Sequence, residues 1–488
     1  MAAIKLLSFL CFLIANILFV RSQDSFEKCT SVDYDALMGK LPFATKFFLI
    51  PPGFQVETAS GACYVLDVHQ SGFAKKHRSI FETYHCATTF GYGTTAVNTA
   101  RSTAEFCHCV QDMFNLPFMI PLKSHLQWIF ARDCHLNSRK LNDLALYRPG
   151  TGRIWILKNE NGVFSPRYAE GDPGTGIGGY NLLSRADRVF ACDYDHSGKV
   201  DHIALYRPGT GTIWILKNSN GTFSPVYAQG DPGSGIGGYD LRSAADRAFA
   251  YDYDHSGKLD HLALYRPGTG TIWILKNENG VFSPVYAQGD PGYGIGGYNL
   301  WSRADRIITY DYDHSGKMDH IVLYRPGTGT IWILKNENGI FIPVYRQGDP
   351  GNAIGGYDLR SPADRIFAYD YDSSGKMDHL ALYRPGTGTI WILKNSNGNF
   401  SPVYAQGDPG TGIGGYDLLS RADTAFAYDY DGSGKKDHIA LYRPGTGTIW
   451  ILKNNNGMFS RVYAQGDPGS GIGGYDLLSP ADSAFTVM

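Results

Sequence analysis

Short apolar segments alternate with polar turns along the C-terminal three-quarters of the chain, and the pattern repeats. In one representative unit, residues 246–300, we expect four strands rich in β-forming residues, at 247–252, 261–266, 271–276 and 281–288. The segments between them are Asp-His-Ser-Gly-Lys, Pro-Gly-Thr-Gly and Asn-Glu-Asn-Gly, and Gly, Pro and Asn supply the dihedral angles that turns require. No segment shows helical periodicity. The pattern predicts an all-β fold.

The repeat has a fixed period of 59 residues. It is marked by the tryptophans of Ile-Trp-Ile-Leu-Lys-Asn, which are Trp155, Trp214, Trp273, Trp332, Trp391 and Trp450. Four antiparallel strands per unit, joined to the next unit by a glycine-rich crossover such as 289–298, are the composition of a propeller blade. We predict a β-propeller of six 59-residue, four-stranded blades. A β-solenoid and a seven-bladed propeller are the alternatives.

The end of the chain favours a closed ring. Residues 481–485 repeat the start of a blade, as seen at 245–249, and the chain then stops after three more residues. Placed beside the first repeat, this lone strand would close the circle and remove exposed sheet edges. Residues 129–133 also resemble a first strand and compete for that place unless a seventh blade exists.

The N-terminal quarter differs from the repeats. Lys5 followed by the apolar residues 6–20 is typical of a secretion signal, so we predict a signal peptide at 1–22. Residues 23–127 form a small cysteine-containing module of unknown fold, and 128–488 form the propeller. The mature chain is expected to be secreted, extracellular and without a membrane span. Its seven cysteines indicate disulfide bonds and leave one thiol over.

Two further features bear on the cellular setting and the partners. The tripeptides that begin at Asn220 and Asn399 are N-glycosylation signals, in agreement with secretion. The chain has 44 basic and 46 acidic residues, so its net charge is close to zero. No strong field favours nucleic acid, which we exclude as a partner.

The sharpest chemical motif is an Asp-x-Asp-x-Ser-Gly-x-x-Asp loop between the first and second strands of a blade. Calcium requires six to eight oxygen ligands, and alternate positions of such a loop direct theirs inward, so we predict calcium as a cofactor. The predicted ligands are Asp193, Asp195, Ser197 and Asp201; Asp252, Asp254, Ser256 and Asp260; Asp311, Asp313, Ser315 and Asp319; Asp370, Asp372, Ser374 and Asp378; Asp429, Asp431, Ser433 and Asp437. The alternative is a metal-free turn whose carboxylates accept backbone N–H bonds.

The Asp loop, the following apolar strand and the Asn-x-Asn-Gly-x-Phe turn together resemble the FG-GAP or VCBS repeat. The resemblance covers residues 129–488. It implies a calcium-binding propeller like those of integrin α-subunits and integrin-like fungal lectins, although those lectins have seven blades. Leu-Tyr-Arg-Pro-Gly stands here where the family often has Gly-Phe-Gly.

A second repeated feature is a set of aromatic and polar residues, such as Tyr239, Arg266 and Trp273, that has the character of an exposed surface. Sugar recognition requires a flat aromatic face together with fixed hydrogen-bonding groups. The tyrosine of the Gly-Gly-Tyr crossover is the predicted carbohydrate contact, whereas the tryptophans are expected to fill space between sheets. The predicted tyrosines are Tyr180, Tyr239, Tyr298, Tyr357, Tyr416 and Tyr475.

These observations predict a secreted, multivalent, lectin-like protein that binds glycans or extracellular glycoproteins, because six similar surfaces combine weak contacts into avidity. The repeats contain no constellation of unlike catalytic groups, so we expect no enzyme. Two alternatives stay open. One is a structural or adhesive matrix protein that binds other proteins. The other is an enzyme or toxin in residues 23–127, with the propeller as its targeting module.

Overall fold

The computed structural model describes residues 143–487, apart from 161 and 220, and four short strands nearer the N-terminus. The chain divides into two compact units, residues 1–139 and 140–488. In the first unit, one sheet has the order β1-β3-β4-β2, with β1 at Leu18–Phe19, β2 at Thr30–Val32, β3 at Gln55–Thr58 and β4 at Cys63–Leu66. The predictions for the signal peptide and the cysteine module otherwise lie outside the described residues.

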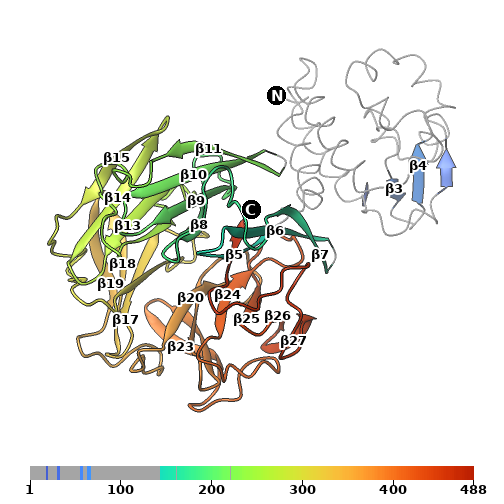
Figure 1. The fold of residues 1–488 in the computed structure, drawn as a ribbon. Helices are drawn as coiled ribbons and strands as arrows, with labels where there is room; N and C mark the ends of the chain where they lie inside the picture. The colour runs from blue at the N-terminus through green and yellow to red at the C-terminus, as the bar shows by residue number, and fades with distance from the viewer. Residues whose placement is uncertain are drawn as a thin grey trace, which may run out of the picture. The chain divides into compact units, whose positions relative to one another are not determined.

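The second unit is a six-bladed β-propeller in which every blade is an antiparallel sheet of four strands (Figure 1). The first strands are β8 (Arg188–Cys192), β12 (Arg247–Tyr251), β16 (Arg306–Tyr310), β20 (Arg365–Tyr369), β24 (Thr424–Tyr428) and β28 (Ser483–Val487). The second strands are β5 (Asp143–Arg148), β9 (His202–Arg207), β13 (His261–Arg266), β17 (His320–Arg325), β21 (His379–Arg384) and β25 (His438–Arg443).

The outer half of each blade completes the sheet. The third strands are β6 (Arg153–Glu160), β10 (Thr212–Ser219), β14 (Thr271–Glu278), β18 (Thr330–Glu337), β22 (Thr389–Ser396) and β26 (Thr448–Asn455). The fourth strands are β7 (Val163–Ala169), β11 (Thr222–Ala228), β15 (Val281–Ala287), β19 (Ile340–Arg346), β23 (Asn399–Ala405) and β27 (Met458–Ala464).

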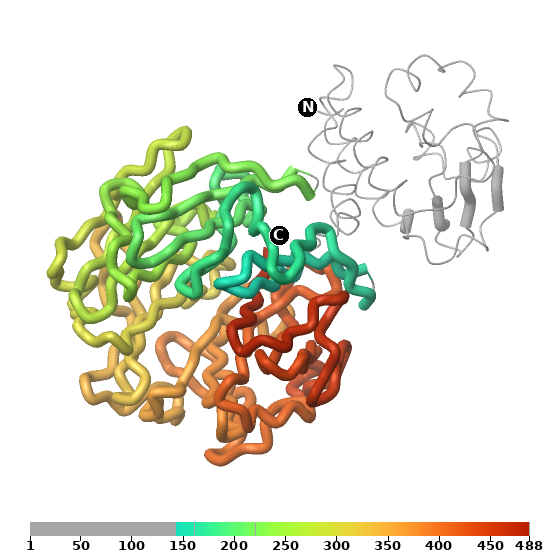
Figure 2. Tube along the Cα trace, in the orientation of Figure 1, coloured from blue at the N-terminus to red at the C-terminus, as the bar shows by residue number. Residues whose placement is uncertain are grey.

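The last strand closes the ring. β28 pairs antiparallel with β5, from Ser483 opposite Tyr147 to Val487 opposite Asp143, so the first blade has the order β28-β5-β6-β7. In Figure 2 the red C-terminal end accordingly returns to the teal start of the propeller. First strands of neighbouring blades contact one another, which places them at the centre of the ring. The predictions of six blades and of closure by the C-terminal strand are confirmed.

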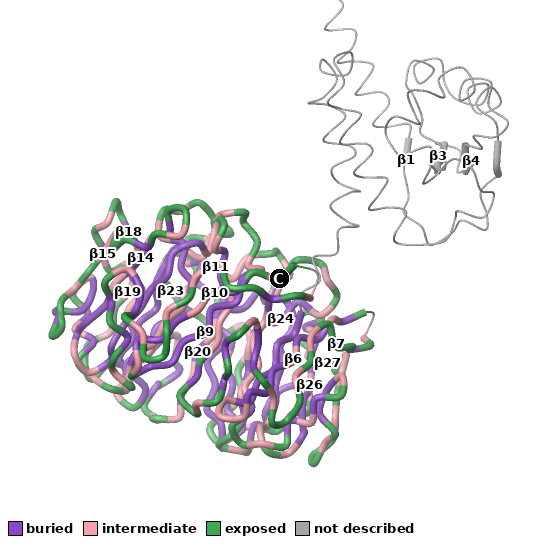
Figure 3. The backbone as a smooth tube through the Cα atoms, turned by 45° about the horizontal axis from the view of Figure 1, so that its top comes forward, coloured by how far each residue is buried: buried purple, intermediate pink, exposed green. Residues whose placement is uncertain are grey.

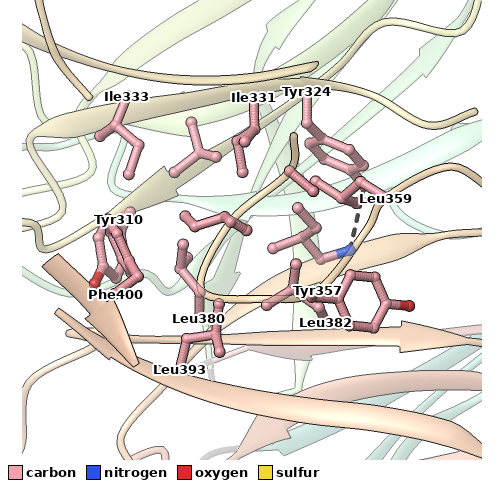
Figure 4. Close-up of a cluster of buried hydrophobic side chains, with 14 of the residues drawn as sticks. Tyr310, Tyr324, Ile331, Ile333, Tyr357, Leu359, Leu380, Leu382, Leu393 and Phe400 are labelled. Atoms are coloured by element: carbon pink, nitrogen blue, oxygen red, sulfur yellow. Dashed lines mark hydrogen bonds between the residues drawn. The ribbon is translucent and has the colours of Figure 1, made fainter. Parts of the chain in front are cut away.

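The hydrophobic core lies between blades. In Figure 3 the middle strands are mostly buried and the connecting loops exposed. One cluster joins Ile331 and Ile333 of β18 to Leu380 and Leu382 of β21 in the next blade, with Leu359 of the crossover between them (Figure 4). A single blade exposes two apolar faces, and packing against both neighbours buries them, so stability depends on a complete ring.

The fourth strand has features of a protected edge. Pro284 of β15 pairs with Leu275 of β14 where the register between the two strands shifts. Proline lacks an N–H group and a bulge twists the strand, and both discourage edge-to-edge pairing with another molecule. The strand is mostly exposed, in contrast to the buried second strand of each blade.

The strand positions expected from the sequence are confirmed to within about two residues at each end. The described residues contain no helix, and hence none long and apolar enough to cross a membrane. Asn399, one predicted glycosylation site, is exposed at the start of β23, whereas Asn220 lies outside the described residues. Cys192 is buried with a free thiol, and its burial raises the pKa of that group.

Candidate functional site

The Asp loop between β12 and β13 is shaped by its first aspartate. Asp252 is fully buried, and its two carboxylate oxygens accept the backbone N–H groups of Ser256 at 2.9 Å and Gly257 at 2.8 Å. Ser256 in turn accepts the backbone N–H of Lys258 through its hydroxyl at 3.3 Å. These are the hydrogen bonds of the metal-free turn. They recur around Asp193, Asp311, Asp370 and Asp429.

The ninth residue of the loop joins neighbouring blades. Asp260 Oδ2 lies 2.8 Å from His196 Nδ1 in the preceding blade, and His196 Nε2 lies 2.9 Å from the Asn277 carbonyl oxygen. Both partners offer acceptor oxygens, an arrangement that favours the protonated form of the imidazole. The hydrogen bond to Asp260 raises the pKa of His196. Burial opposes ionisation of Asp260, but bonds from His261 and His196 lower its pKa.

The third and ninth residues of each loop lie close to the histidine that begins the second strand of the blade. Asp254, Asp260 and His261 place one ligand atom each within 4.8 Å of one another. The same cluster is formed by Asp195, Asp201 and His202; by Asp313, Asp319 and His320; by Asp372, Asp378 and His379; and by Asp431, Asp437 and His438. The predicted ligands thus divide into two groups. The first Asp and the Ser serve the turn, and the other two carboxylates face a shared space.

The crossover tyrosines occupy the interior. Tyr239 is 3% exposed, its hydroxyl donates to Asp246 Oδ1 at 2.8 Å, and its ring packs edge-on against Trp273 with centroids 6.0 Å apart. The turn before it depends on glycine, because a Cβ on Gly235 would lie 1.8 Å from the Tyr239 carbonyl oxygen. All six predicted tyrosines are at most 3% exposed. This burial argues against the prediction that their rings stack on sugars.

Arg266 was expected to be exposed, and it lies in a cage of carboxylates. It is 8% exposed and forms a bidentate pair with Asp246, with Nε to Oδ1 at 2.8 Å and Nη2 to Oδ2 at 3.0 Å. Asp240 accepts a further bond at 2.6 Å, and Asp290 contacts Nη1. Asp246 lies in the crossover before β12, and Asp290 lies in the crossover after β15. The cage therefore ties the crossovers to the strands.

The tryptophans of the repeat are structural, as expected. Trp273 is partly buried, and its indole N–H donates to the Gln288 carbonyl oxygen at 2.7 Å. A Cβ on Gly238 of the preceding crossover would lie 3.2 Å from the Trp273 ring. The glycine pair thus allows the crossover to cover the indole, which leaves little of its face for a ligand.

Two aromatic side chains that sequence reasoning missed are strongly exposed. Tyr293 is 83% exposed and Trp301 is 59% exposed, and both lie on the crossover between β15 and β16. The Trp301 indole N–H donates to the Gly292 carbonyl oxygen at 3.2 Å, which fixes the ring near Tyr293. The sequence signal that could have revealed these two residues is their departure from the repeat. The equivalents of Tyr293 are Thr175, Ser234, Asn352, Thr411 and Ser470, and those of Trp301 are Leu183, Arg242, Arg360, Leu419 and Leu478.

Comparisons with known proteins show the fold alone. No family model and no curated protein sequence matches this chain. A putative 6-phosphogluconolactonase from Bacteroides fragilis is similar in structure at 9% identity and a TM-score of 0.40, over 72% of this chain and 99% of that one. The periplasmic gluconolactonase of Pseudomonas aeruginosa follows at 12% identity and a TM-score of 0.35, over 71% and 99%. A chain of a nidogen/laminin complex has 10% identity and a TM-score of 0.34, over 66% and 92%.

These similarities correct one expectation. The repeats contain no constellation of unlike catalytic groups, so we expected no enzyme, but propellers with enzyme names are among the similar structures. The expectation that the chain is not an enzyme is therefore corrected, because the propeller fold alone does not exclude catalysis. At these identities the likeness assigns no activity to this chain. Beyond the propeller itself, the resemblance to the FG-GAP or VCBS repeat gains no support from the family models.

Proposed function

We propose that this protein is a secreted, extracellular propeller that binds carbohydrate through the crossover between β15 and β16. The observation that carries the proposal is the exposed pair of Tyr293 and Trp301. They are the two large aromatic side chains that are exposed among the described residues of the propeller. Exposed aromatic rings that are held in place present the flat apolar face on which a sugar ring packs.

The surroundings of the pair support this use. The Asn299 side-chain oxygen accepts the Trp301 backbone N–H at 3.1 Å and an Arg325 N–H at 2.9 Å, so the loop is held by the buried part of the next blade. A prearranged site loses less conformational entropy on binding than a mobile one. The exposed polar side chains of Asp290 and Arg303 lie on the same crossover and can serve sugar hydroxyls.

The test is glycan binding by the full chain and by two variants. Screening on an array of immobilised glycans in calcium-containing buffer should identify ligands, whose affinities are then measured by calorimetry. Trp301→Ala is expected to weaken binding about tenfold or more, because removing a central aromatic contact typically costs about 2 kcal/mol. Leu419→Ala, at the equivalent position of another blade, should bind as the unmodified chain does. Absence of binding to every glycan on the array, or equal affinities in all three proteins, would contradict the proposal.

We also propose that calcium stabilises the Asp loops, with the third and ninth aspartates as its protein ligands. Asp254 and Asp260 offer the carboxylate oxygens that a hard cation prefers, and water would complete the coordination. The first aspartate would keep its role in the turn. Binding to the native state alone would raise the stability of the propeller, by about 2.7 kcal/mol per site at a calcium concentration 100 times the dissociation constant.

Thermal unfolding of the full chain with calcium and then with excess chelator measures this effect. The melting temperature is expected to fall when the chelator is added. The fall should disappear in a variant that carries Asp195→Asn, Asp254→Asn, Asp313→Asn, Asp372→Asn and Asp431→Asn. A control variant with alanine at Ser197, Ser256, Ser315, Ser374 and Ser433 should keep the calcium response, because those hydroxyls belong to the turn. An unchanged melting temperature of the unmodified chain after addition of the chelator would contradict the proposed calcium sites.

A further inference from the structure

Arginine opens the innermost strand of four consecutive blades. The residues are Arg188, Arg247, Arg306 and Arg365, and the last two blades carry Thr424 and Ser483 in the same place. Because the positions are equivalent and these strands meet at the centre of the ring, the six residues begin their strands at one level around the axis. The order around the ring is thus cationic over four blades and neutral over two.

These arginines are held differently from the caged arginines of the second strands. Within the part of the chain that the structure describes, none of the four forms an ion pair with a carboxylate. Asp246 directly precedes Arg247, but it is turned away and bonded to Arg266. Asp305 and Asp364, which precede the next two arginines, are likewise bonded to Arg325 and Arg384. The nearby carboxylates are therefore already paired.

Arg306 lies close enough to Arg247 and Arg365 for repulsion between them, whereas Arg188 at the end of the arc is exposed. Burial and then the neighbouring Arg247 lower the pKa of Arg306, and Arg365 lowers it further. Arg365 contacts hydroxyl groups, with a bond from Nη1 to the Thr424 hydroxyl at 3.2 Å and a hydrogen bond with Tyr383. Arg247, Arg306 and Arg365 are all partly buried. Like charges gathered in a partly buried space are unfavourable unless an anion compensates them.

We propose that the centre of the ring binds a small multivalent anion, a molecule that carries two or more phosphate, sulfate or carboxylate groups, through Arg188, Arg247, Arg306 and Arg365. Guanidinium groups form bidentate, charge-assisted hydrogen bonds with all three types of group. An arc of four cations can engage several such groups on one molecule. Thr424 and Ser483 take the equivalent positions in the other two blades, so the arc of cations is not a full circle.

The proposed anion site is separate from the proposed carbohydrate surface, and the Trp301→Ala variant distinguishes the two. Tyr293 and Trp301 lie on a crossover, whereas the arginines lie on the first strands. Loss of glycan binding in Trp301→Ala with unchanged anion binding would therefore show that the two sites are separate. The proposal of the anion site is tested independently of glycan binding.

The test uses the full chain at low ionic strength with pyrophosphate, sulfate and citrate as probes and sodium chloride at matched ionic strength as the reference. At least one probe should bind saturably in calorimetry and raise the melting temperature beyond the chloride reference, and the probe that does so identifies the chemical class. Arg306→Gln should weaken that binding about tenfold or more, because the variant loses charge-assisted hydrogen bonds to the anion. Arg242→Gln, an exposed crossover arginine, is the matched control and should bind normally.

Stability without any multivalent anion provides the second measurement. Arg306→Gln should melt no lower than the unmodified chain under those conditions, since a like-charged neighbour has been removed; Arg247→Gln repeats the test at a second position. Absence of saturable binding by all three probes would overturn the proposal. Equal loss of binding in Arg306→Gln and Arg242→Gln would overturn it too, because the effect would then reflect net charge alone.

Discussion

Replacing Asp246 with alanine is expected to lower the free energy of unfolding by about 3–5 kcal/mol, the cost of leaving one member of a buried ion pair without its partner. Asp246 is fully buried and accepts two bonds from Arg266. It also accepts the Tyr239 hydroxyl and the backbone N–H of Ser243 at 2.9 Å. The variant removes the acceptor of four hydrogen bonds at once. Chemical denaturation followed by tryptophan fluorescence measures the loss.

The matched control is Asp290→Ala. Asp290 contacts the same guanidinium group, but its side chain is 43% exposed, so solvent replaces much of what is lost. We expect a loss of about 1 kcal/mol or less for that variant. Comparable losses in the two variants would show that Asp246 has no special place in the cage. The cage recurs around Arg148, Arg207, Arg325, Arg384 and Arg443, so the difference should reappear in any blade.

The cage also shows why the sequence predicted the fold better than the site. Turn residues and β-forming segments act locally, so the strands near Trp273 could be placed from their own composition. The exposure of Arg266 depends on Asp240, Asp246 and Asp290, which reach it from loops on either side in the chain. A polar residue next to a turn has the same local pattern whether it faces water or a buried carboxylate.

The burial of the crossover tyrosines could not be predicted for the same reason, and the missed aromatics show which sequence signal marks exposed side chains. Tyr239 was chosen because it recurs, but a residue repeated in all six blades serves the contact that every blade makes, namely packing against the next one. Tyr293 and Trp301 interrupt the repeat, as do Thr424 and Ser483 at the centre of the ring. In a chain of near-identical units, the positions that differ are better guides to a site than those that are shared.

Removing residues 483–488 is expected to destabilise the whole propeller, by about 5 kcal/mol or more. The deletion removes β28 and its ladder with β5, in which each backbone hydrogen bond contributes about 1 kcal/mol. It also removes buried Val487 and the edge-on contact of Phe485 with Tyr147, whose ring centroids lie 6.0 Å apart. The exposed edge of β5 would then be free to pair with other molecules, so we expect aggregation during thermal unfolding.

Deleting Met488 alone is the control, because it leaves β28 complete and should change the free energy of unfolding by no more than about 0.5 kcal/mol. The comparison tests whether the ring is cooperative. β28 belongs to the same blade as β5, β6 and β7, yet the Ala484 backbone N–H also donates to the Tyr442 hydroxyl of the preceding blade at 3.2 Å. If only the first blade unfolded and the other five kept their transition, the blades would be stable as an open array. If the entire propeller instead lost its cooperative unfolding transition, closure by these few residues would be shown to stabilise all six blades.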